Sequence, residues 1–344
     1  MTGASGALLD AWLGAVPAAV VGSVRSARSV LVVSHENPDA DTLGAALALR
    51  VIAESGGGRA TLVCADAPPP LYAFLPGIDA FVTDPEAGRE YDLAILVDCG
   101  SLDRVGPVRE RHAALFERLP TVVIDHHASN GAAGPADWVD PQAAATCELV
   151  TLLATVLGVS LGSADGALAT ALMAGIVMDT ATFAHPNATP RTLAVSAALV
   201  AAGAPLAEIS RRLYRSKPDV QLRLFGRVLD RLQTTAGGLV IHSTLLASDI
   251  AETGALSAHS EGIIDLLSQS ENAEVAILFK EAGPAATRIS VRTKPGGVDA
   301  IALTSLFGGG GHPRAAGASI PASVGEARAL VLPAAERLAA AVAR

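Results

Sequence analysis

Short apolar segments without polar alternation recur through the first half of the chain, and they limit the folds that it can adopt. They are SVLVVS at 29–34, RATLVCA at 59–65, DLAILVDCG at 92–100 and TVVIDHH at 121–127, and helical stretches alternate with them. Strands that are apolar on both faces are typical of parallel sheets covered by helices. The sequence therefore predicts an α/β fold with a doubly wound, mainly parallel N-terminal sheet.

Polar side chains stand where several of these apolar segments end. They are His35, Asp98, Asp125 and, at the end of a later apolar helix, Asp179. Sheets of this kind bind ligands beyond the carboxyl ends of their strands. We therefore expect these side chains to meet in one pocket.

Four neighbouring residues are candidates for the same pocket, namely Asp39, Asp41, His126 and His127. Carboxylates that crowd together lose hydration and repel one another unless cations lie among them. Two ions roughly 3.5–4 Å apart are a common arrangement for phosphoryl hydrolysis. Because the candidate ligands offer oxygen and imidazole but no thiolate, they suit Mn²⁺ better than structural zinc.

The last third of the chain has a different pattern. Residues 273–297 are expected to form two strands joined by a Gly/Pro turn, followed by a short helix at 298–307. The sequence GGGGHPRAAGA at 308–318 reads as a glycine-rich loop, with a strand and a C-terminal helix after it. This pattern predicts a second, smaller α/β domain.

Composition excludes several classes of protein. Half of the residues are hydrophobic and 17% are charged, which is typical of a globular chain. The net charge of −9 argues against binding of long nucleic acid. No apolar segment reaches 18 residues, so we expect no membrane span. The N-terminus lacks the basic region of a signal peptide, and Cys64, Cys99 and Cys147 form no CxxC pair, so a cytoplasmic location with reduced thiols is expected.

Five motifs together resemble a known family. SHENPDADTLG, LVDCG, DHH and GIVMDTATF occur in the order found in the DHH phosphoesterase superfamily, and FGGGGHPRAAGA is similar to the substrate loop of the DHHA1 domain. The length and layout resemble the stand-alone subfamily of nanoRNases, pAp phosphatases and cyclic-di-AMP phosphodiesterases. The resemblance implies a DHH catalytic domain at 1–192, a helical linker at 193–217 and a DHHA1 domain at 218–344, with the active site in the cleft between the domains.

The resemblance also implies two Mn²⁺ ions, for which Co²⁺ or Mg²⁺ are substitutes, bridged by one carboxylate. The first ion would be held by His35, Asp39 and Asp98. The second would be held by Asp41, Asp98, His126 and Asp179. Three residues would be catalytic: Asp98 as the bridge, His127 facing the scissile phosphate, and Asp125 orienting a neighbouring histidine.

The composition of the glycine-rich loop is suited to binding an anion. Consecutive glycines accept positive φ, and their N–H groups can close around an anion. Arg292 on the preceding strand can form a bidentate pair with phosphate. The predicted substrate-binding residues are Arg292, Gly309, Gly310, Gly311, His312 and Arg314.

The function implied by the resemblance is hydrolysis of cyclic-di-AMP, pApA and other very short oligoribonucleotides to AMP, with pAp as a further substrate. The alternatives are a RecJ-like single-strand exonuclease, a DHH-type inorganic pyrophosphatase and a catalytically silent nucleotide sensor. The expected partner is a small nucleotide, without long nucleic acid or membrane, and a homodimer is expected by family analogy alone.

Several residues also have ordinary structural explanations. Taken alone, the motif HENPDAD is also typical of a capped helix start, with Asp41 as the N-cap. The two explanations are compatible, because Asp41 can be both cap and ligand. Arg191 fits either a position near the cleft or a surface position at a helix start. The basic residues between Arg211 and Lys217 are more typical of a solvated face than of an RNA track.

Overall fold

The computed structural model describes residues 8–100, 102–128, 130–131, 134 and 136–342. The chain divides into two compact units, Met1–Ser216 and Lys217–Arg344. Residues of the segment expected as a linker, such as Val195 and Ile209, are buried in the core of the first unit. Each unit is described below by itself.

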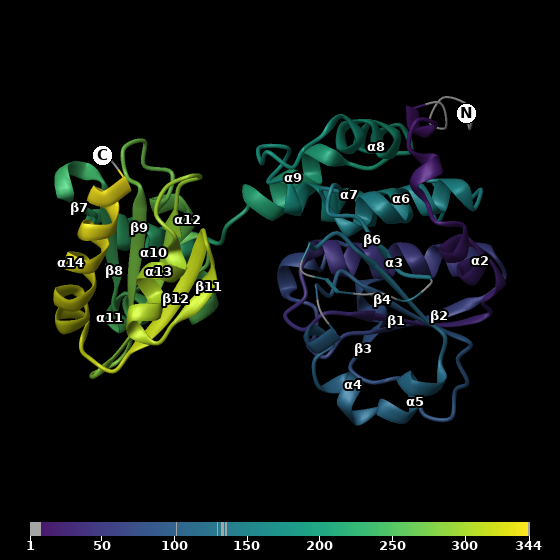
Figure 1. Cartoon of the computed structure of the whole chain (residues 1–344), viewed down its shortest axis with the longest axis horizontal. Helices are drawn as coiled ribbons and strands as arrows, with labels where there is room; N and C mark the ends of the chain where they lie inside the picture. The colour runs from purple at the N-terminus through teal and green to yellow at the C-terminus, as the bar shows by residue number, and fades with distance from the viewer. Residues whose placement is uncertain (1–7, 101, 129, 132–133, 135, 343–344) are drawn as a thin grey trace. The chain divides into compact units, whose positions relative to one another are not determined.

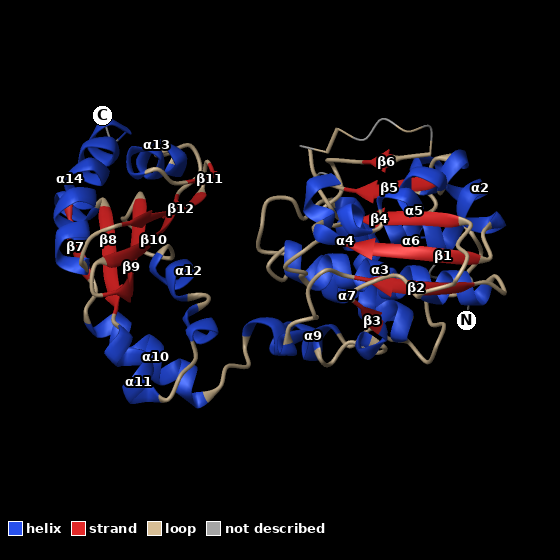
Figure 2. Ribbon diagram, turned by 90° about the horizontal axis from the view of Figure 1, so that it is seen from below, coloured by secondary structure: helices blue, strands red, loops and turns tan. Residues whose placement is uncertain are grey.

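The first unit is built on a parallel sheet of six strands in the order β3-β2-β1-β4-β5-β6, seen in Figure 2. The strands are β1 (Ser29–Ser34), β2 (Arg59–Val63), β3 (Phe81–Val82), β4 (Leu93–Val97), β5 (Thr121–Asp125) and β6 (Trp138–Val139). The strand order reverses between β1 and β4, which is the point where sheets of this kind bind ligands. The predicted doubly wound parallel fold is confirmed.

Helices cover both faces of this sheet (Figure 1). Those of the first unit are α2 (Ala18–Ser26), α3 (Ala40–Ser55), α4 (Pro107–Arg111), α5 (Ala113–Arg118), α6 (Thr146–Val156), α7 (Ala167–Asp179), α8 (Pro190–Ala201) and α9 (Leu206–Tyr214). Val30 and Val32 of β1 face the large core under α3, whereas Leu31 and Val33 face the smaller core beside α4 and α5. Because alternate side chains enter opposite cores, the strand is apolar throughout.

The second unit has a mixed sheet in the order β11-β12-β10-β9-β8-β7, in which only the β8–β9 pairing is parallel. Its strands are β7 (Gln233–Thr235), β8 (Val240–Leu245), β9 (Val275–Gly283), β10 (Ala286–Thr293), β11 (Gly310–His312) and β12 (Ala315–Ile320). Its helices are α10 (Asp219–Asp230), α11 (Ala247–Thr253), α12 (Ile263–Leu267), α13 (Ala300–Thr304) and α14 (Val324–Val342). The predicted second α/β domain is confirmed.

The glycine-rich segment is more ordered than the predicted loop. Its residues form the short edge strand β11, which pairs with β12 in an antiparallel hairpin. A Cβ atom at Gly309 would lie 2.2 Å from the Gly317 carbonyl oxygen, and one at Gly311 would lie 2.6 Å from that of Ala315. Glycine is therefore required here so that the two strands can approach each other.

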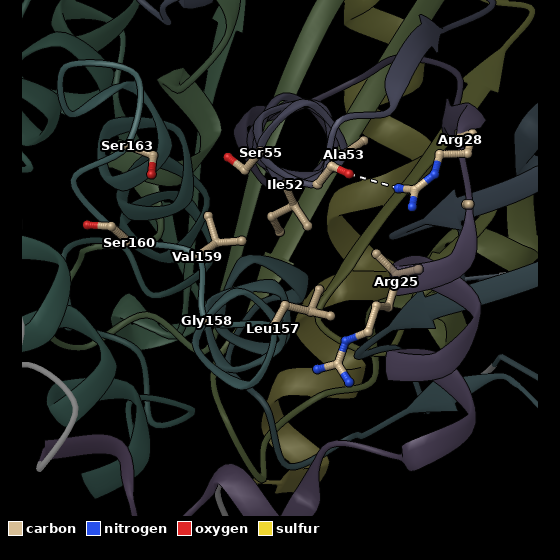
Figure 3. A pocket seen from close by; sticks show the side chains of 13 residues that line it. Arg25, Arg28, Ile52, Ala53, Ser55, Leu157, Gly158, Val159, Ser160 and Ser163 are labelled. Atoms are coloured by element: carbon tan, nitrogen blue, oxygen red, sulfur yellow. Dashed lines mark hydrogen bonds between the residues drawn. The ribbon is translucent and has the colours of Figure 1, made fainter.

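A hollow of about 380 Å³ lies in the first unit where α2, α3 and α6 end (Figure 3). Arg25, Arg28 and Ser55 are among the residues that line it. Arg28 precedes β1 and donates a hydrogen bond to the Gly56 carbonyl over 2.8 Å. The hollow thus lies at the amino ends of the strands, away from the predicted site.

Within the described residues no single helix has the length and apolar character needed to cross a membrane, and the pair α8 and α9, bent by 113°, meets those criteria only when taken together.

Candidate active site

His35 follows β1 directly, beside the point where the strand order reverses. Its Nδ1 donates a hydrogen bond to the Glu36 carbonyl over 2.7 Å. Its Nε2 is buried and has no hydrogen-bond partner among the described residues. The nearest carboxylate oxygens belong to Asp98, at 3.6 Å, and Asp39, at 3.9 Å. Nε2 therefore points at two acidic groups without being bonded to either.

Asp39 is the N-cap of α3, because its Oδ1 accepts hydrogen bonds from the backbone N–H groups of Asp41 and Thr42 at 2.9 and 3.2 Å. The expectation that Asp41 caps this helix was wrong. Asp41 lies inside the first turn of α3, and its carboxylate is free to point toward the neighbouring helices.

The fully buried carboxylate of Asp41 is held by the N-terminus of α6. The backbone N–H groups of Thr146 and Cys147 donate to its two oxygens over 2.6 and 2.9 Å. A helix N-terminus favours negative charge at this position. Gly175 of α7 permits the approach, since a Cβ there would lie 2.5 Å from Oδ1 of Asp41.

Asp98 lies at the centre of the cluster, one residue beyond β4, with a backbone φ of 58° that aspartate tolerates better than most residues. Its Oδ2 is 3.6 Å from Nε2 of His35, and its Oδ1 is 3.4 Å from Nε2 of His126 and 3.5 Å from Nδ1 of His127. The Thr146 hydroxyl donates to Oδ1 over 3.0 Å. One carboxylate thus adjoins all three predicted histidines.

His126 and Asp179 approach each other from β5 and α7. Nε2 of His126 lies 3.1 Å from Oδ2 of Asp179, while its Nδ1 donates to the Ala143 carbonyl over 3.3 Å. The backbone carbonyl of Asp179 accepts hydrogen bonds from Nδ1 of His185 at 3.1 Å and from Nδ2 of Asn187 at 3.3 Å. These bonds fix the end of α7 and with it the Asp179 side chain.

His127 turns toward Asp125. Its backbone N–H and its Nδ1 both donate to Oδ1 of Asp125, over 2.9 and 2.7 Å. Oδ2 accepts from the Gly100 N–H at 2.6 Å and from Asn130 at 2.5 Å. Burial opposes ionisation of Asp125, but these hydrogen bonds outweigh it and lower the pKa of its carboxyl group. Asp125 therefore orients His127 and leaves Nε2 of that ring for a ligand.

The structure brings the predicted ligands into three overlapping groups whose candidate ligand atoms lie within 4.8 Å of one another. The groups are His35, Asp39 and Asp98; Asp41, His126 and Asp179; and Asp98, His126 and His127. The first two groups resemble the two predicted ligand sets, and Asp98 adjoins both. That these residues bind metal stays a prediction.

Burial and the close charges of the cluster both shift the pKa values of its residues. Burial, reinforced by neighbouring carboxylates, raises the pKa of Asp41 well above its usual value and that of Asp179 to about 6. Burial would lower the pKa of both histidines, but adjacent carboxylates outweigh it and raise His35 to about 10 and His126 to about 12. Burial also acts to raise the pKa of Asp98, yet His126 and His35 hold it below its usual value.

The donor set fits divalent cations. Without ions, the cluster gains positive charge by protonation of its histidines. Bound cations would supply this charge instead, since opposite charge within about 4–6 Å stabilises carboxylates. Nε2 of His35, buried without a hydrogen bond, has the position of a ligand atom. The Nδ1 hydrogen bonds of His35 and His126 to carbonyl groups fix each ring as metal-ligating histidines require.

In the second unit, two of the predicted substrate residues, Arg292 and His312, point to the same face of the sheet. Arg292 of β10 is opposite Ala315 of β12, which in turn is opposite His312 of β11. Directly opposite residues point to the same face. Arg292 is not free, because its Nε donates to Oδ1 of Asp265 over 2.8 Å. Gly310 and Gly311 lie on β11 beside them, Gly309 precedes that strand, and Arg314 follows it in the hairpin turn.

Comparison with known proteins identifies the family of this chain. The DHH family, N-terminal domain, matches residues 29–176, and the DHHA1 domain matches residues 239–341. The chain is 31% identical to a protein of Thermus thermophilus named bifunctional oligoribonuclease and PAP phosphatase NrnA, over 85% of this chain and 84% of the relative. It belongs to the DHH family. A Bacillus subtilis protein of the same name is 26% identical, over 85% of this chain and 89% of the relative.

A solved structure supports the fold of this DHH-family chain. It is an exopolyphosphatase-related protein from Bacteroides fragilis, with a TM-score of 0.82 and 21% sequence identity. The match covers 98% of each chain. At this level of identity the likeness concerns the fold alone.

The sequence did not reveal several residues that support the site. Thr146, Asn187 and His185 contact the cluster or its backbone, but a threonine, an asparagine and a histidine carry no motif signal outside the predicted ligand pattern. Thr146 reaches Asp98 from the start of α6, whereas His185 and Asn187 lie after α7 and bond the Asp179 carbonyl. The DHH-family motifs mark the predicted ligands but not these supports.

The structure decides between the alternative positions that the sequence allows for Arg191 and for the basic residues of α9. The Arg191 side chain is only 11% exposed, so it is not a surface arginine. Arg211 and Arg212 both pair with Glu208 on α9 and are 51% and 47% exposed. The basic residues of α9 therefore lie on a solvated helix face, as expected.

Proposed function

We propose that this DHH-family chain is a two-metal phosphodiesterase that hydrolyses very short nucleotides to 5′-mononucleotides. The observation that carries the proposal is the position of Asp98, whose two oxygens face His35 on one side and His126 on the other. A single carboxylate between two ligand groups is the arrangement that a bridged pair of metal ions requires. The names of the two relatives, oligoribonuclease and PAP phosphatase, support this class of substrate.

The proposed ligands of one ion are His35, Asp39 and Asp98, and those of the other are Asp41, Asp98, His126 and Asp179. When bound, two Mn²⁺ ions supply an activated water and neutralise charge on the phosphoryl oxygens. Oxygen and imidazole ligands suit Mn²⁺, with Co²⁺ or Mg²⁺ as substitutes. The N–H groups at the start of α6 hold the Asp41 carboxylate in place and favour its charged form, against the burial that raises its pKa.

His127 is proposed to contact the scissile phosphate. Its side chain is 34% exposed, and Asp125 holds Nδ1, so Nε2 is the atom that can reach a substrate. A proton on Nε2 would be donated to a phosphoryl oxygen or to the leaving oxygen. Asp125 acts through His127 by keeping the Nδ1 proton in place.

The second unit is proposed to bind the remote end of the nucleotide. Arg292, His312 and Arg314 supply charged or polar donors, and Gly309 and Gly311, on either side of Gly310, let the two strands of the hairpin approach each other. Cyclic-di-AMP, pApA, short oligoribonucleotides and pAp are the proposed substrates. The homodimer and the cytoplasmic location stay predictions.

The deciding experiment is product analysis with purified full-length protein and added Mn²⁺. Cyclic-di-AMP, pApA, pAp, a five-nucleotide RNA and pyrophosphate are offered side by side, with Asp98→Asn as the control. Release of AMP from pApA or the RNA by wild type, and not by Asp98→Asn, is the expected result. Consumption of pyrophosphate alone, or of no substrate, would contradict the proposal, the latter outcome favouring a silent sensor.

The same experiment separates the proposed substrates. Conversion of cyclic-di-AMP into pApA and AMP at a rate that rivals the linear substrates would indicate a second-messenger phosphodiesterase. Consumption of only pApA, pAp and RNA would indicate salvage of nucleotides at the end of RNA decay.

A further inference from the structure

Residues 140–146 connect β6 to α6, and we call them the β6–α6 strap. Its Ala143 carbonyl and the backbone and hydroxyl groups of Thr146 contact three of the proposed metal ligands. These ligands are His126, Asp41 and Asp98. A shift of the strap would therefore move the surroundings of both proposed ions at once.

One largely buried arginine joins the first residue of this strap to the helix that follows it. Nη1 of Arg191 donates to Oδ2 of Asp140, the first strap residue, over 2.8 Å. Nε of Arg191 donates over 2.5 Å to Oε1 of Glu148, two residues beyond the strap. The exposed fractions of the three side chains are 11%, 20% and 0%. Their mutual charges raise the pKa of the guanidinium against the effect of burial, so it stays charged.

The middle of the strap is held by the same network. The second oxygen of Glu148, Oε2, accepts a hydrogen bond from the Ala144 N–H over 3.3 Å. Nδ2 of Asn187 donates to the Ala144 carbonyl over 3.2 Å and to the carbonyl of Asp179 over 3.3 Å. Ala144 is thus held through both its N–H group and its carbonyl group.

We propose that Arg191 is a positioning residue for the metal site: by joining Asp140 to Glu148 it holds the β6–α6 strap in the place where it orients His126, Asp41 and Asp98. Loss of the guanidinium leaves Glu148 as a buried charge without its partner, and such a charge draws in water or moves. Displacement of supporting groups by about 1 Å is enough to reduce catalysis on the order of 100-fold. This inference rests on the proposed function.

A purely structural role is the competing explanation, because Arg191 also fastens the start of α8 to the first unit. Val195 provides the matched control. It lies on the same helix, one turn later, and is fully buried in the core, but its apolar side chain takes no part in the hydrogen bonds that hold the strap. Val195→Ala should weaken the packing of α8 while leaving the strap in place.

The test is calorimetric titration of the full-length, metal-stripped protein with MnCl₂, together with the melting temperature of each variant. Arg191→Gln should bind Mn²⁺ roughly 10–100-fold more weakly, as is typical for loss of residues that orient ligands. Arg191→Lys should lie between, since its single ammonium cannot span two carboxylates as a guanidinium does. Val195→Ala should melt earlier but bind Mn²⁺ as wild type does. In steady-state assays Arg191→Gln should lose kcat more than it raises KM.

If Arg191→Gln binds Mn²⁺ as tightly as wild type, the positioning role is overturned. It is also overturned if Val195→Ala, with the same melting temperature as Arg191→Gln, loses Mn²⁺ affinity to the same extent. If Arg191→Gln does not fold, Arg191→Lys is the variant that tests the proposal. Wild-type Mn²⁺ affinity in Arg191→Lys would then overturn the positioning role. If folded wild-type protein binds no Mn²⁺, the proposed function itself fails, and this result is distinct from equal binding by wild type and variant.

Discussion

The hydroxyl group of Thr146 donates a hydrogen bond to Oδ1 of Asp98 over 3.0 Å, and both side chains are buried. The two residues come from different elements, since Thr146 begins α6 and Asp98 follows β4. Asp98 also adjoins His126 through the same oxygen, at 3.4 Å. The hydroxyl group thus fixes the rotation of the carboxylate that the proposed mechanism uses as a bridge.

Thr146→Val tests this relationship. The substitution keeps the shape of the side chain but removes the donor, so the Asp98 carboxylate loses one hydrogen bond and its fixed orientation. We expect Mn²⁺ affinity and kcat/KM to fall roughly 10–100-fold, as for other groups that orient metal ligands. Titration with MnCl₂ and steady-state assays on pApA measure the two quantities.

Thr151→Val is the matched control for this prediction. Thr151 lies on the same helix and is buried, but its hydroxyl donates to the Cys147 carbonyl over 2.7 Å and touches no acidic residue of the cluster. It should retain wild-type activity. Equal effects of the two substitutions would show that α6 stability, and not the Asp98 orientation, is responsible.

Arg292→Ala should raise KM more than it lowers kcat, because Arg292 is proposed to bind a phosphate remote from the reaction. Loss of one charge-assisted hydrogen bond of roughly 1.5–3 kcal/mol corresponds to an increase in KM on the order of 10–100-fold. Arg288→Ala, four residues earlier on the same strand, is the control and should change KM less. Initial rates over a range of pApA concentrations give both constants, and an unchanged KM would place Arg292 outside the site.

Asp265→Asn should have the opposite effect on the same constant. Oδ1 of Asp265 now accepts the Nε–H of Arg292 over 2.8 Å, and both side chains are partly exposed, at 55% and 32%. Removing the charge of Asp265 makes the guanidinium more available to an anion, so KM for pApA should fall. A higher KM would mean that Asp265 instead aligns Arg292 for the substrate.

The residues at the strand ends could be predicted from the sequence because parallel strands end at one edge of a sheet. His35, Asp98 and Asp125 follow directly from that rule once β1, β4 and β5 are recognised. The apolar segments were visible because both faces of each strand are buried. Asp179 could be predicted from the family motif, and the end of α7 brings it 3.1 Å from His126.

The supports of the site could not be predicted, because they depend on contacts between distant segments. Thr146 is separated from Asp98 by 48 residues, and Arg191 from Asp140 by 51. The structural alternative for this segment made Asp41 the N-cap of α3, although Asp39 holds that position, since both residues are suitable caps and only the backbone geometry separates them. The glycine hairpin was expected as a loop because its edge strand lacks the side chains that signal a strand.

Ala181→Gly should stabilise the first unit. Ala181, Thr182 and Phe183 follow α7 with φ values of 47°, 58° and 65°, in the left-handed region. This conformation costs a residue with a Cβ roughly 1–2 kcal/mol, whereas glycine loses roughly 0.4–1 kcal/mol through its freer unfolded state. We expect a net gain of up to about 1.6 kcal/mol, measured by urea unfolding with tryptophan fluorescence. Ala197→Gly, at an exposed position inside α8, should instead lose about 1 kcal/mol.

His242 should make the stability of the second unit depend on pH. It lies on β8 and is only 1% exposed, its Nδ1 has no hydrogen-bond partner among the described residues, and its ring packs edge-on against Phe279. Burial, with a further contribution from the charge of Arg328, lowers the pKa of His242 from 6.5 to about 4, against the opposing charge of Glu336. The unfolded chain therefore binds a proton between pH 6.5 and pH 4 that the folded chain does not bind.

The contribution of neutral His242 to the free energy of unfolding is therefore fully present above pH 6.5. It should decrease as the pH falls toward 4, by at most about 1.4 kcal/mol per pH unit. His242→Leu removes the titrating group while keeping the site apolar and similar in volume, so the decline should become shallower. Hydrogen exchange of the β8 and β9 amides at pH 7.5, 6.0 and 5.0, corrected for the intrinsic pH dependence of exchange, measures the opening free energy. The same decline in wild type and His242→Leu would show that other groups carry the acid sensitivity.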